Sequence, residues 1–454
     1  MGTTFYSLLI HSFASVVCQK KSRQSSSMPP KCSANTNRMS QKLPDSNTLS
    51  TARAFSEKIS LSGSGQYFEL FTSANDLTTG WEKVQPENVF LQRTYLGTLE
   101  SNPPRGMQFN YLIFYKDSSP IGIAYCQISN FRPDKSIRDL SVKDKYPCII
   151  RAFARNFKNF VASKLDHNLL VCGNLLLTGE HGFHFVPGAV SKATQFRLIE
   201  EALILVQKNW EDKGLAVDGI FIKDVQESHR APSRIFVEKK FREFTFHPNM
   251  VMTLRPDWAT FDDYLNDVTS KYRMRAKRAF KLIANLEKRE LTAQQIFDNK
   301  ERLYELYKKM MDNASFNMVV LHEDYLPSLK SALGDKFRIF GYYCDGELMG
   351  YYSTILNHHE LEAHFLGFEP ACNKECQIYL NMLFDILRNG IELGARCVVY
   401  ARTAMEIKSS VGAEPYDMYC YIRSNNPITN KILPPLLEYL RPPDDWLQRD
   451  PFKK

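Results

Sequence analysis

The sequence predicts an α/β protein made of two similar halves, each with a mixed β-sheet flanked by helices. One observation is a strand–helix–strand pattern, in which an amphipathic helix at 377–393 separates apolar runs at 361–368 and 397–400. The other is an internal repeat, because the hairpin pattern of 110–128 returns at 337–355. A parallel pair joined through a helix, together with antiparallel hairpins, predicts a mixed sheet.

Length and composition divide the chain into a tail and two predicted domains. Residues 1–55 contain seven Lys or Arg and a single acidic residue, Asp45, and are rich in Ser, Asn and Gln. This composition predicts a disordered tail, although the apolar stretch 7–17 also leaves a targeting segment open. We expect a first domain over 56–253, acting as a degenerate partner, and a second domain over 254–454 that holds the site and begins with a basic helix.

The overall composition argues against two classes of protein. The chain is 44% hydrophobic and 24% charged, with no long apolar run, so we expect no transmembrane helix. Of the formal charge of +8, residues 1–55 contribute +6 (seven basic minus one acidic), which leaves +2 for the rest, too little for a strongly basic nucleic-acid binder. The ten cysteines lack paired spacings, which predicts reduced core residues, a cytoplasmic location and no metal site.

A dense polar group follows the apolar strand 397–400, at the place where parallel strands usually bind their ligands. Arg402 is predicted to bind a carboxylate or phosphate through two hydrogen bonds, Lys408 to hold a phosphate as a point charge, and Thr403 to contribute to the same binding site. Glu406 is a candidate to orient either cation or to accept the proton of an amine. The alternative is a structural network of ion pairs that caps the following helix.

A long basic helix is predicted over 262–289. Six of its cations fall on two stripes, one formed by Lys271, Arg275 and Arg278 and the other by Arg273, Lys277 and Lys281. We interpret Arg275 and Arg278 as part of a cationic wall beside a phosphate-bearing substrate. A solvated outer face is the alternative.

Four sequence motifs carry a resemblance to a known family. They are KYRMRAKRAFK, FRIFGYYCDGELMGYYS, HFLGFEP and, most specifically, YARTAMEIKSSVGAEP. Together they resemble the acyl-CoA N-acyltransferase (GNAT) superfamily, and the duplication resembles the Fem-type peptidoglycan-bridge aminoacyltransferases and the BioF2-like acetyltransferase domain. The resemblance is best over 255–425 and extends to 60–250. It implies two tandem GNAT-like domains and transfer of an acyl group from acyl-CoA to an amine acceptor.

One motif of that family is missing. Members that bind acyl-CoA usually carry a Gln/Arg-x-x-Gly-x-Gly/Ala loop, whose backbone amides hold the pyrophosphate at a helix N-terminus. The equivalent residues 371–377, ACNKECQ, contain no glycine. A Fem-like enzyme that uses aminoacyl-tRNA does not need this loop, and tRNA contact through the basic helix would fit that version. A non-catalytic binding protein with the same fold is the third alternative.

Acyl transfer to an amine needs a proton acceptor, a stabilised oxyanion and, for some leaving groups, a proton donor. Glu362 and His364 project from the same face of the strand 360–366 and are candidate general bases. Tyr400 is a candidate proton donor, as is Tyr379. The alternatives are surface positions for the first two residues and core positions for the two tyrosines.

A final predicted feature is the segment 442–454, PPDDWLQRDPFKK. Its Trp446 and Phe452 indicate an ordered strap rather than a loose tail.

Overall fold

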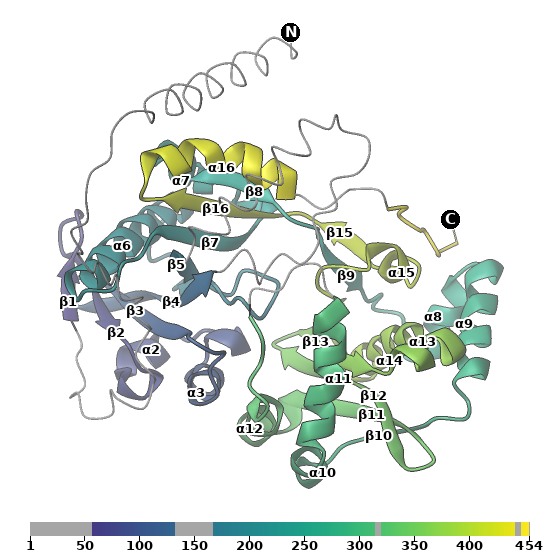
Figure 1. Cartoon of the computed structure of the whole chain (residues 1–454). Helices are drawn as coiled ribbons and strands as arrows, with labels where there is room; N and C mark the ends of the chain where they lie inside the picture. Colours follow the sequence, from purple (N-terminus) through teal and green to yellow (C-terminus); the bar gives the residue numbers. More distant parts are fainter. Residues whose placement is uncertain (1–56, 132–166, 314–318, 441–445, 454) are drawn as a thin grey trace, which may run out of the picture. The chain divides into compact units, whose positions relative to one another are not determined.

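The computed structural model describes residues 57–131, 167–313, 319–440 and 446–453, which all belong to one compact unit (Figure 1). The predicted tail 1–55 lies outside the described residues. In this part of the chain the helices are too short or too polar to cross a membrane.

The first sheet has one parallel pair and otherwise antiparallel neighbours. In spatial order its strands are β1 (Glu57–Ser60), β2 (Gln66–Phe71), β3 (Gln108–Lys116), β4 (Ser119–Phe131), β5 (His167–Cys172), β7 (Gly219–Gln226), β16 (Met418–Ser424) and β8 (Arg242–Thr245). A short strand, β6 (Phe183–Phe185), pairs with β4 outside this path. The parallel pair is β5–β7, joined through helix α6 (Lys192–Asp212).

The second sheet repeats this order and polarity. Its strands, in spatial order, are β10 (Glu287–Glu290), β11 (Phe337–Cys344), β12 (Glu347–Asn357), β13 (Glu360–Phe368), β14 (Cys397–Val399), β9 (Asn249–Thr253) and β15 (Glu414–Tyr416). Its parallel pair is β13–β14, joined through α14 (Ile378–Glu392), as the strand–helix–strand pattern predicted. Two mixed sheets of the same design confirm the predicted fold class.

Each sheet is completed by a strand from the other half of the chain (Figure 1). Strand β9 follows β8 in sequence but inserts between β14 and β15 of the second sheet. Strand β16 follows β15 and makes the reciprocal move, inserting between β7 and β8. Neither sheet is therefore complete without both halves. The predicted domain boundary between 253 and 254 stays a prediction, and the structure adds that strands are exchanged across it.

Helices pack on both sheets. The other α-helices of the described residues are α2 (Thr79–Lys83), α3 (Arg93–Ser101), α7 (Ile235–Glu238), α8 (Phe261–Asp267), α9 (Ser270–Leu282), α10 (Ala293–Asp298), α11 (Lys300–Asn313), α12 (Tyr325–Leu333), α13 (Pro370–Cys376), α15 (Met405–Ser409) and α16 (Pro427–Leu440). One core lies between the first sheet and α6, and a second core lies between the second sheet and helices α8, α9 and α14. A third, shared core joins the halves, where α3 packs against α12.

Three predicted elements differ from the structure. The apolar pattern predicted a single strand over 244–254, which is wrong, because the chain divides there into β8 and β9. Pro248 lies between these strands: it has no N–H for a strand hydrogen bond, and it restricts the backbone of the residue before it. The helix predicted over 262–289 is also wrong as one element, since Val268 is extended and separates α8 from α9. The loop at 371–377 is instead mostly the short helix α13, which begins at a proline suited to a first helical turn.

Close packing of α11 against β13 depends on a glycine. A Cβ atom at Gly367 would lie 2.5 Å from the backbone carbonyl carbon of Leu306. We therefore expect Gly367→Ala to lower the free energy of unfolding by about 1–3 kcal/mol, as overpacking does elsewhere. Urea denaturation measures this change.

The matched control is Gly97→Ala in α3, where no atom lies within 4 Å of the added Cβ. Alanine there should stabilise the helix by about 0.5–1 kcal/mol. Equal effects at Gly97 and Gly367 would contradict the packing argument.

Candidate functional site

A basic pocket of about 610 Å³ lies between α9, α13, α14 and α15. The residues that line it are Lys271, Met274, Arg275, Arg278, Asn373, Gln377, Leu380 and Ile407. Three of them are cations, three are apolar and none is acidic, so the pocket suits a ligand with both a negatively charged and an apolar part. Arg275 and Arg278, which the sequence predicted to bind phosphate, both lie in it.

Among the described residues, the cations of helix α9 have no carboxylate partner. Its buried side consists of Ala276 and Ala279, whose small side chains let the helix lie close to α14. The side chain of Asn381 in α14 donates a hydrogen bond of 3.1 Å to the carbonyl oxygen of Ala279. Within the described ranges, none of these α9 cations forms an ion pair with an acidic side chain: Lys271, Arg275, Lys277, Arg278 and Lys281. Their mutual repulsion favours an anionic ligand.

Helix α13 occupies the place expected for the family's glycine-rich loop. It links β13 to α14, and Gln377 at the junction has a left-handed backbone with φ of 51°. The side chain of Asn373 accepts a hydrogen bond of 3.1 Å from the backbone N–H of Tyr379, in the first turn of α14. One amide of this helix N-terminus therefore already has a partner. An anion in the basic pocket would meet mainly the side chains of α9.

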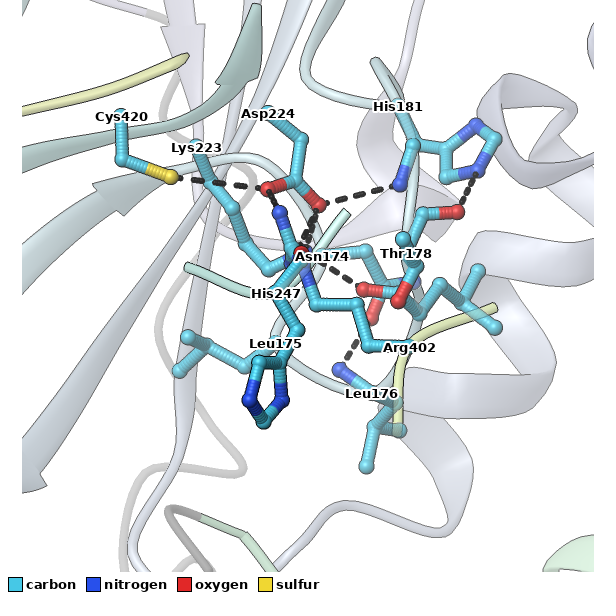
Figure 2. Close-up of polar contacts among 12 residues, drawn as sticks. Asn174, Leu175, Leu176, Thr178, His181, Lys223, Asp224, His247, Arg402 and Cys420 are labelled. Carbon is cyan, nitrogen blue, oxygen red and sulfur yellow. Dashed lines mark hydrogen bonds and ion pairs between the residues drawn. The ribbon is translucent and has the colours of Figure 1, made fainter. Parts of the chain in front are cut away.

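A buried charge cluster joins the two halves at the carboxyl ends of β7 and β14 (Figure 2). Asp224 accepts hydrogen bonds from both terminal nitrogens of Arg402, at 2.6 and 3.2 Å. Lys223 contacts the same carboxylate and donates to the carbonyl oxygen of Leu177 at 2.5 Å. The backbone N–H of Gly179 adds a bond of 3.0 Å to Asp224. We call Asp224, Arg402 and Lys223 the interhalf clamp.

The carboxylate of the interhalf clamp is ionised. Burial opposes the ionisation of Asp224, but Arg402 and Lys223 outweigh burial and hold the pKa of this carboxyl well below its usual range. Burial lowers the pKa of Lys223, while the neighbouring Asp224 opposes that shift. Asp224 also has φ of 61°, a left-handed conformation that costs free energy in a non-glycine residue. The contacts of the clamp hold this conformation in place.

Comparison with known protein families identifies part of the chain. Residues 270–416 match the family model of the acetyltransferase (GNAT) domain. This part of the chain is a GNAT domain. It contains α9, α13, α14 and α15, and hence every residue that lines the basic pocket.

Solved structures resemble the chain at low sequence identity. The crystal structure of FemX has 12% identity and a TM-score of 0.46, covering 84% of this chain and 100% of its own. A tandem GNAT protein from the clavulanic acid biosynthesis pathway has 12% identity and a TM-score of 0.44, covering 79% and 99%. The structure of L-PGS from Bacillus licheniformis has 11% identity and a TM-score of 0.39, covering 75% and 95%. No curated protein matches the chain by sequence.

In the GNAT domain, the predicted binding group after β14 supports the backbone. Lys408 donates hydrogen bonds to the carbonyl oxygens of Tyr400, Ala401 and Arg402, at 2.6, 3.1 and 2.6 Å. Burial lowers the pKa of Lys408 to about 7. Arg402, besides its place in the clamp, donates to the carbonyl oxygen of His247 at 2.8 Å. These contacts are structural, but they differ from the expected ion-pair network at the following helix, because Lys408 binds carbonyl oxygens that precede α15 and Arg402 pairs with the other half. The predicted ligand roles of Arg402 and Lys408 stay predictions.

The other two residues of that group are exposed. Thr403 is exposed with a left-handed φ of 69°. Glu406 pairs with Arg449, with 3.1 Å between Nε and the carboxylate oxygen. Neither residue lines the basic pocket, although Ile407, beside Glu406, does. The structure therefore does not bring Thr403 and Glu406 together with the cations of α9.

His364 belongs to a hydrogen-bonded chain that crosses between the halves. The amide of Asn174 donates to the hydroxyl of Tyr95 at 3.0 Å, and this hydroxyl lies 3.3 Å from that of Tyr325. The hydroxyl of Tyr325 lies 3.2 Å from Nε2 of His364, and Nδ1 lies 3.2 Å from Oγ of Ser353. Burial lowers the pKa of His364 to about 3, so the ring is neutral. The amide donor at one end makes Nε2 an acceptor and Nδ1 a donor, and both nitrogens are engaged.

Glu362 is buried at the point where β13 and β14 stop pairing. Only 7% of the residue is exposed, so the alternative of a surface position is wrong for Glu362. It forms the last parallel pair of the two strands, with Val399. Burial, together with the nearby Glu360, raises the pKa of Glu362 to about 8. A carboxyl group with such a pKa is suited to general base catalysis near neutral pH.

The two tyrosines lie in the second core. The hydroxyl of Tyr400 donates to the carbonyl oxygen of Leu383 at 2.7 Å, and burial raises its pKa. Tyr379 packs against the same core, and burial raises its pKa as well. Both positions agree with the alternative that the sequence left open for these residues.

Sequence reasoning missed the two members of the interhalf clamp that come from the first half. Lys223 and Asp224 lie near the end of an apolar strand. A charged pair at the carboxyl end of a parallel strand could have marked them as candidate site residues. Their partner Arg402 is 178 positions from Asp224, and nothing local in the sequence connects them.

Breaking the interhalf clamp should destabilise the protein strongly. Asp224→Asn leaves two cations without their carboxylate, and we expect a loss of about 3–5 kcal/mol in the free energy of unfolding. Denaturant titration measures it. The control is Glu57→Gln, whose ion pair with Lys213 is 46% and 52% exposed and should contribute at most about 1 kcal/mol. A loss at Asp224 no larger than at Glu57 would mean that the clamp contributes little.

Proposed function

We propose that this protein is an N-acyltransferase that moves an acyl group from acyl-CoA to an amine acceptor. The observation that carries the proposal is the basic pocket in the GNAT domain, where three cations lie beside apolar side chains and no lining residue is acidic. The phosphates of CoA would pair with Lys271, Arg275 and Arg278. The less polar arm of the donor would lie along Leu380 and Ile407.

The second sheet separates this pocket from the proposed general base. Helices α9 and α14, which line the pocket, pack on the face of the sheet that carries the second core. The cross-strand neighbour of Glu362 is Ile355, which belongs to the shared core on the opposite face. Strands β13 and β14 stop pairing beyond Glu362 and Val399. A donor that enters from the helix side and passes between the strands would present its acyl carbon to the side of Glu362.

Glu362 would accept the proton that the amine loses. The amine nitrogen forms a bond to the acyl carbon, and the bond from that carbon to sulfur breaks with its electron pair on sulfur. The CoA thiolate takes a proton from solvent and leaves as a thiol, while Glu362 returns the amine proton to solvent. Burial of Glu362, which raises its pKa to about 8, makes the ionised carboxylate a stronger base than an exposed one.

A second candidate donor is aminoacyl-tRNA, as in the Fem-type interpretation. The observation that favours it is that α9 carries further cations outside the pocket lining, Lys277 and Lys281, which form no ion pair with an acidic residue of the described ranges. Backbone phosphates of an RNA would extend along such a helix, and their binding would weaken steeply with salt. If neither donor binds, a non-catalytic binding role for the GNAT fold becomes the better account.

We also infer a cytoplasmic location. The seven cysteines within the described ranges are all free thiols, which supports a reducing compartment.

Neutralising the pocket cations should weaken donor binding. A hydrogen bond to a charged group contributes about 1.5–3 kcal/mol, so Arg275→Gln or Arg278→Gln should each raise the dissociation constant of CoA by roughly 10-fold or more. Isothermal titration at low salt measures this, and a thermal shift with saturating CoA gives a second readout.

The matched control for these variants is Lys277→Gln, on the same helix but outside the pocket lining. It should leave CoA binding within about twofold of the wild type. A thermal shift of the wild type with tRNA but none with CoA would favour the second donor. Equal losses in all three variants would point to general electrostatic attraction rather than to a CoA site.

Removing the carboxyl group of Glu362 should affect both the rate and the pH dependence of stability. Glu362→Gln should lower kcat by about 10²–10⁴-fold while leaving CoA binding unchanged, since the residue acts on the amine. Because the folded carboxyl keeps its proton up to a pKa of about 8 and the unfolded one releases it near 4.5, wild-type stability should fall as pH rises between these values.

The slope of that fall is at most about 1.4 kcal/mol per pH unit, and Glu362→Gln should flatten it. Denaturation at a series of pH values measures the slope. A variant with unchanged kcat would exclude Glu362 as the base, and an unchanged slope would show that it is not held protonated.

A further inference from the structure

The segment Trp446–Lys453, which we call the strap, lies against the GNAT domain. Trp446 and Phe452 pack on the second core, in agreement with the ordered strap that the sequence predicted. The ring of Phe452 lies 5.9 Å from that of Trp258 and 6.1 Å from that of Tyr264, measured between centroids. These aromatic contacts anchor the strap on α8 and on the residues before it.

One end of the strap is fixed at the start of α9. Val268 and Phe452 form a β-bridge, and the backbone N–H of Thr269 donates to the carbonyl oxygen of Pro451 at 2.8 Å. Thr269 is the N-cap residue of α9, and Lys271 of the basic pocket lies in the first turn that follows. The strap therefore holds the backbone from which this wall of the pocket begins.

The middle of the strap is fixed to α15. The guanidinium of Arg449 pairs with Glu406, and its backbone N–H donates to Oγ of Ser409 at 3.0 Å. Ile407, between these two partners, lines the basic pocket. The same strap thus holds two separate walls of one pocket.

The seat of the strap tolerates no side chain just after α15. Gly412 has φ of 105°, and a Cβ atom there would lie 2.7 Å from the ring of Phe452. The ring is therefore in direct contact with the backbone that follows α15, and a side chain at position 412 would push α15 and the strap apart.

We propose that the strap positions the donor pocket, with Arg449 as a positioning residue that fixes α15 and the first half of α9 relative to each other. The second half of α9 has its own support, because Asn381 of α14 binds the carbonyl oxygen of Ala279. The first half, which carries Lys271 and Arg275, is held by the strap. It is also held by a bond of 3.4 Å from Arg273 to the carbonyl oxygen of Leu265 and by the packing of Tyr272 on the second core. This inference rests on the proposed donor site for its consequence in binding, while its structural part can be tested without any ligand.

The ligand-free test is hydrogen exchange followed by mass spectrometry on the full-length protein. Arg449→Gln and Phe452→Ala should each speed amide exchange in the first turns of α9 by about 10-fold, because these turns lose a tether. Peptides from α14 should exchange at the wild-type rate. The control is Gln448→Ala, an exposed position of the strap. Unchanged exchange in α9 for both test variants would overturn the proposal.

The binding test uses CoA as the probe in a double-mutant cycle. Arg449→Gln should raise the dissociation constant of CoA by about 3–10-fold, since the pocket must then be ordered on binding. It should also reduce the effect of Lys271→Gln on CoA binding, because Lys271 lies in the first half of α9, which the strap holds. The effect of Arg278→Gln on CoA binding should stay unchanged. The charge-exchanged pair Glu406→Arg/Arg449→Glu should recover binding relative to either single reversal.

The outcomes of the two tests separate this inference from the proposed function. If the wild type does not bind CoA, the proposed donor is wrong and hydrogen exchange alone decides the role of the strap. If CoA binds but Arg449→Gln leaves both its affinity and the exchange of α9 unchanged, the strap does not position the pocket.

Discussion

The reciprocal exchange of β9 and β16 is the constraint on which the rest of the structure depends. Each exchanged strand pairs on both sides, so its removal would leave two open strand edges in the sheet that it completes. The two halves therefore cannot separate without breaking both sheets. Strand β9 pairs with β14, and β16 pairs with β7. The exchange therefore also links β14 to β7, whose carboxyl ends lie close together. The interhalf clamp stands at this meeting point.

The interhalf clamp shows why a charged residue after a buried strand need not be a ligand-binding residue. Arg402 and Lys408 were attractive candidates, because cations at the carboxyl end of a parallel strand are typical of binding sites. In the structure one cation neutralises Asp224 and the other satisfies three carbonyl oxygens. A buried ion pair is costly to desolvate, and in some proteins its role is to fix one arrangement rather than to add net stability. Here the arrangement that it fixes is the junction of the two halves.

Local patterns predicted the parts of the fold that depend on neighbours in sequence. The helix at 377–393 and the repeated hairpin were recognisable because period and turn chemistry are local properties. The sheet to which β9 belongs could not be predicted in this way, since the sequence pattern of a strand is the same whether it joins one sheet or the other. The site divides in the same way. The stripe of Arg275 and Arg278 followed from helical spacing, whereas the burial of Glu362 follows from long-range packing that a single strand does not reveal.

With α13 in place of a glycine-rich loop, the proposed anionic donor would be held in a different way. Backbone amides at a helix N-terminus are already ordered when the ligand arrives, so they cost little entropy on binding. Lysine and arginine side chains lose up to about 2 kcal/mol of rotamer freedom each when they are ordered. A pocket built on the side chains of α9 therefore needs that helix to be held firmly, so that only the side chains remain to be ordered. The bond from Asn381 at one end of α9 and the strap at the other supply that support. On this argument the proposed donor pocket, which lacks the glycine-rich loop, would need the strap, because a pocket that relies on side chains must fix the backbone that carries them.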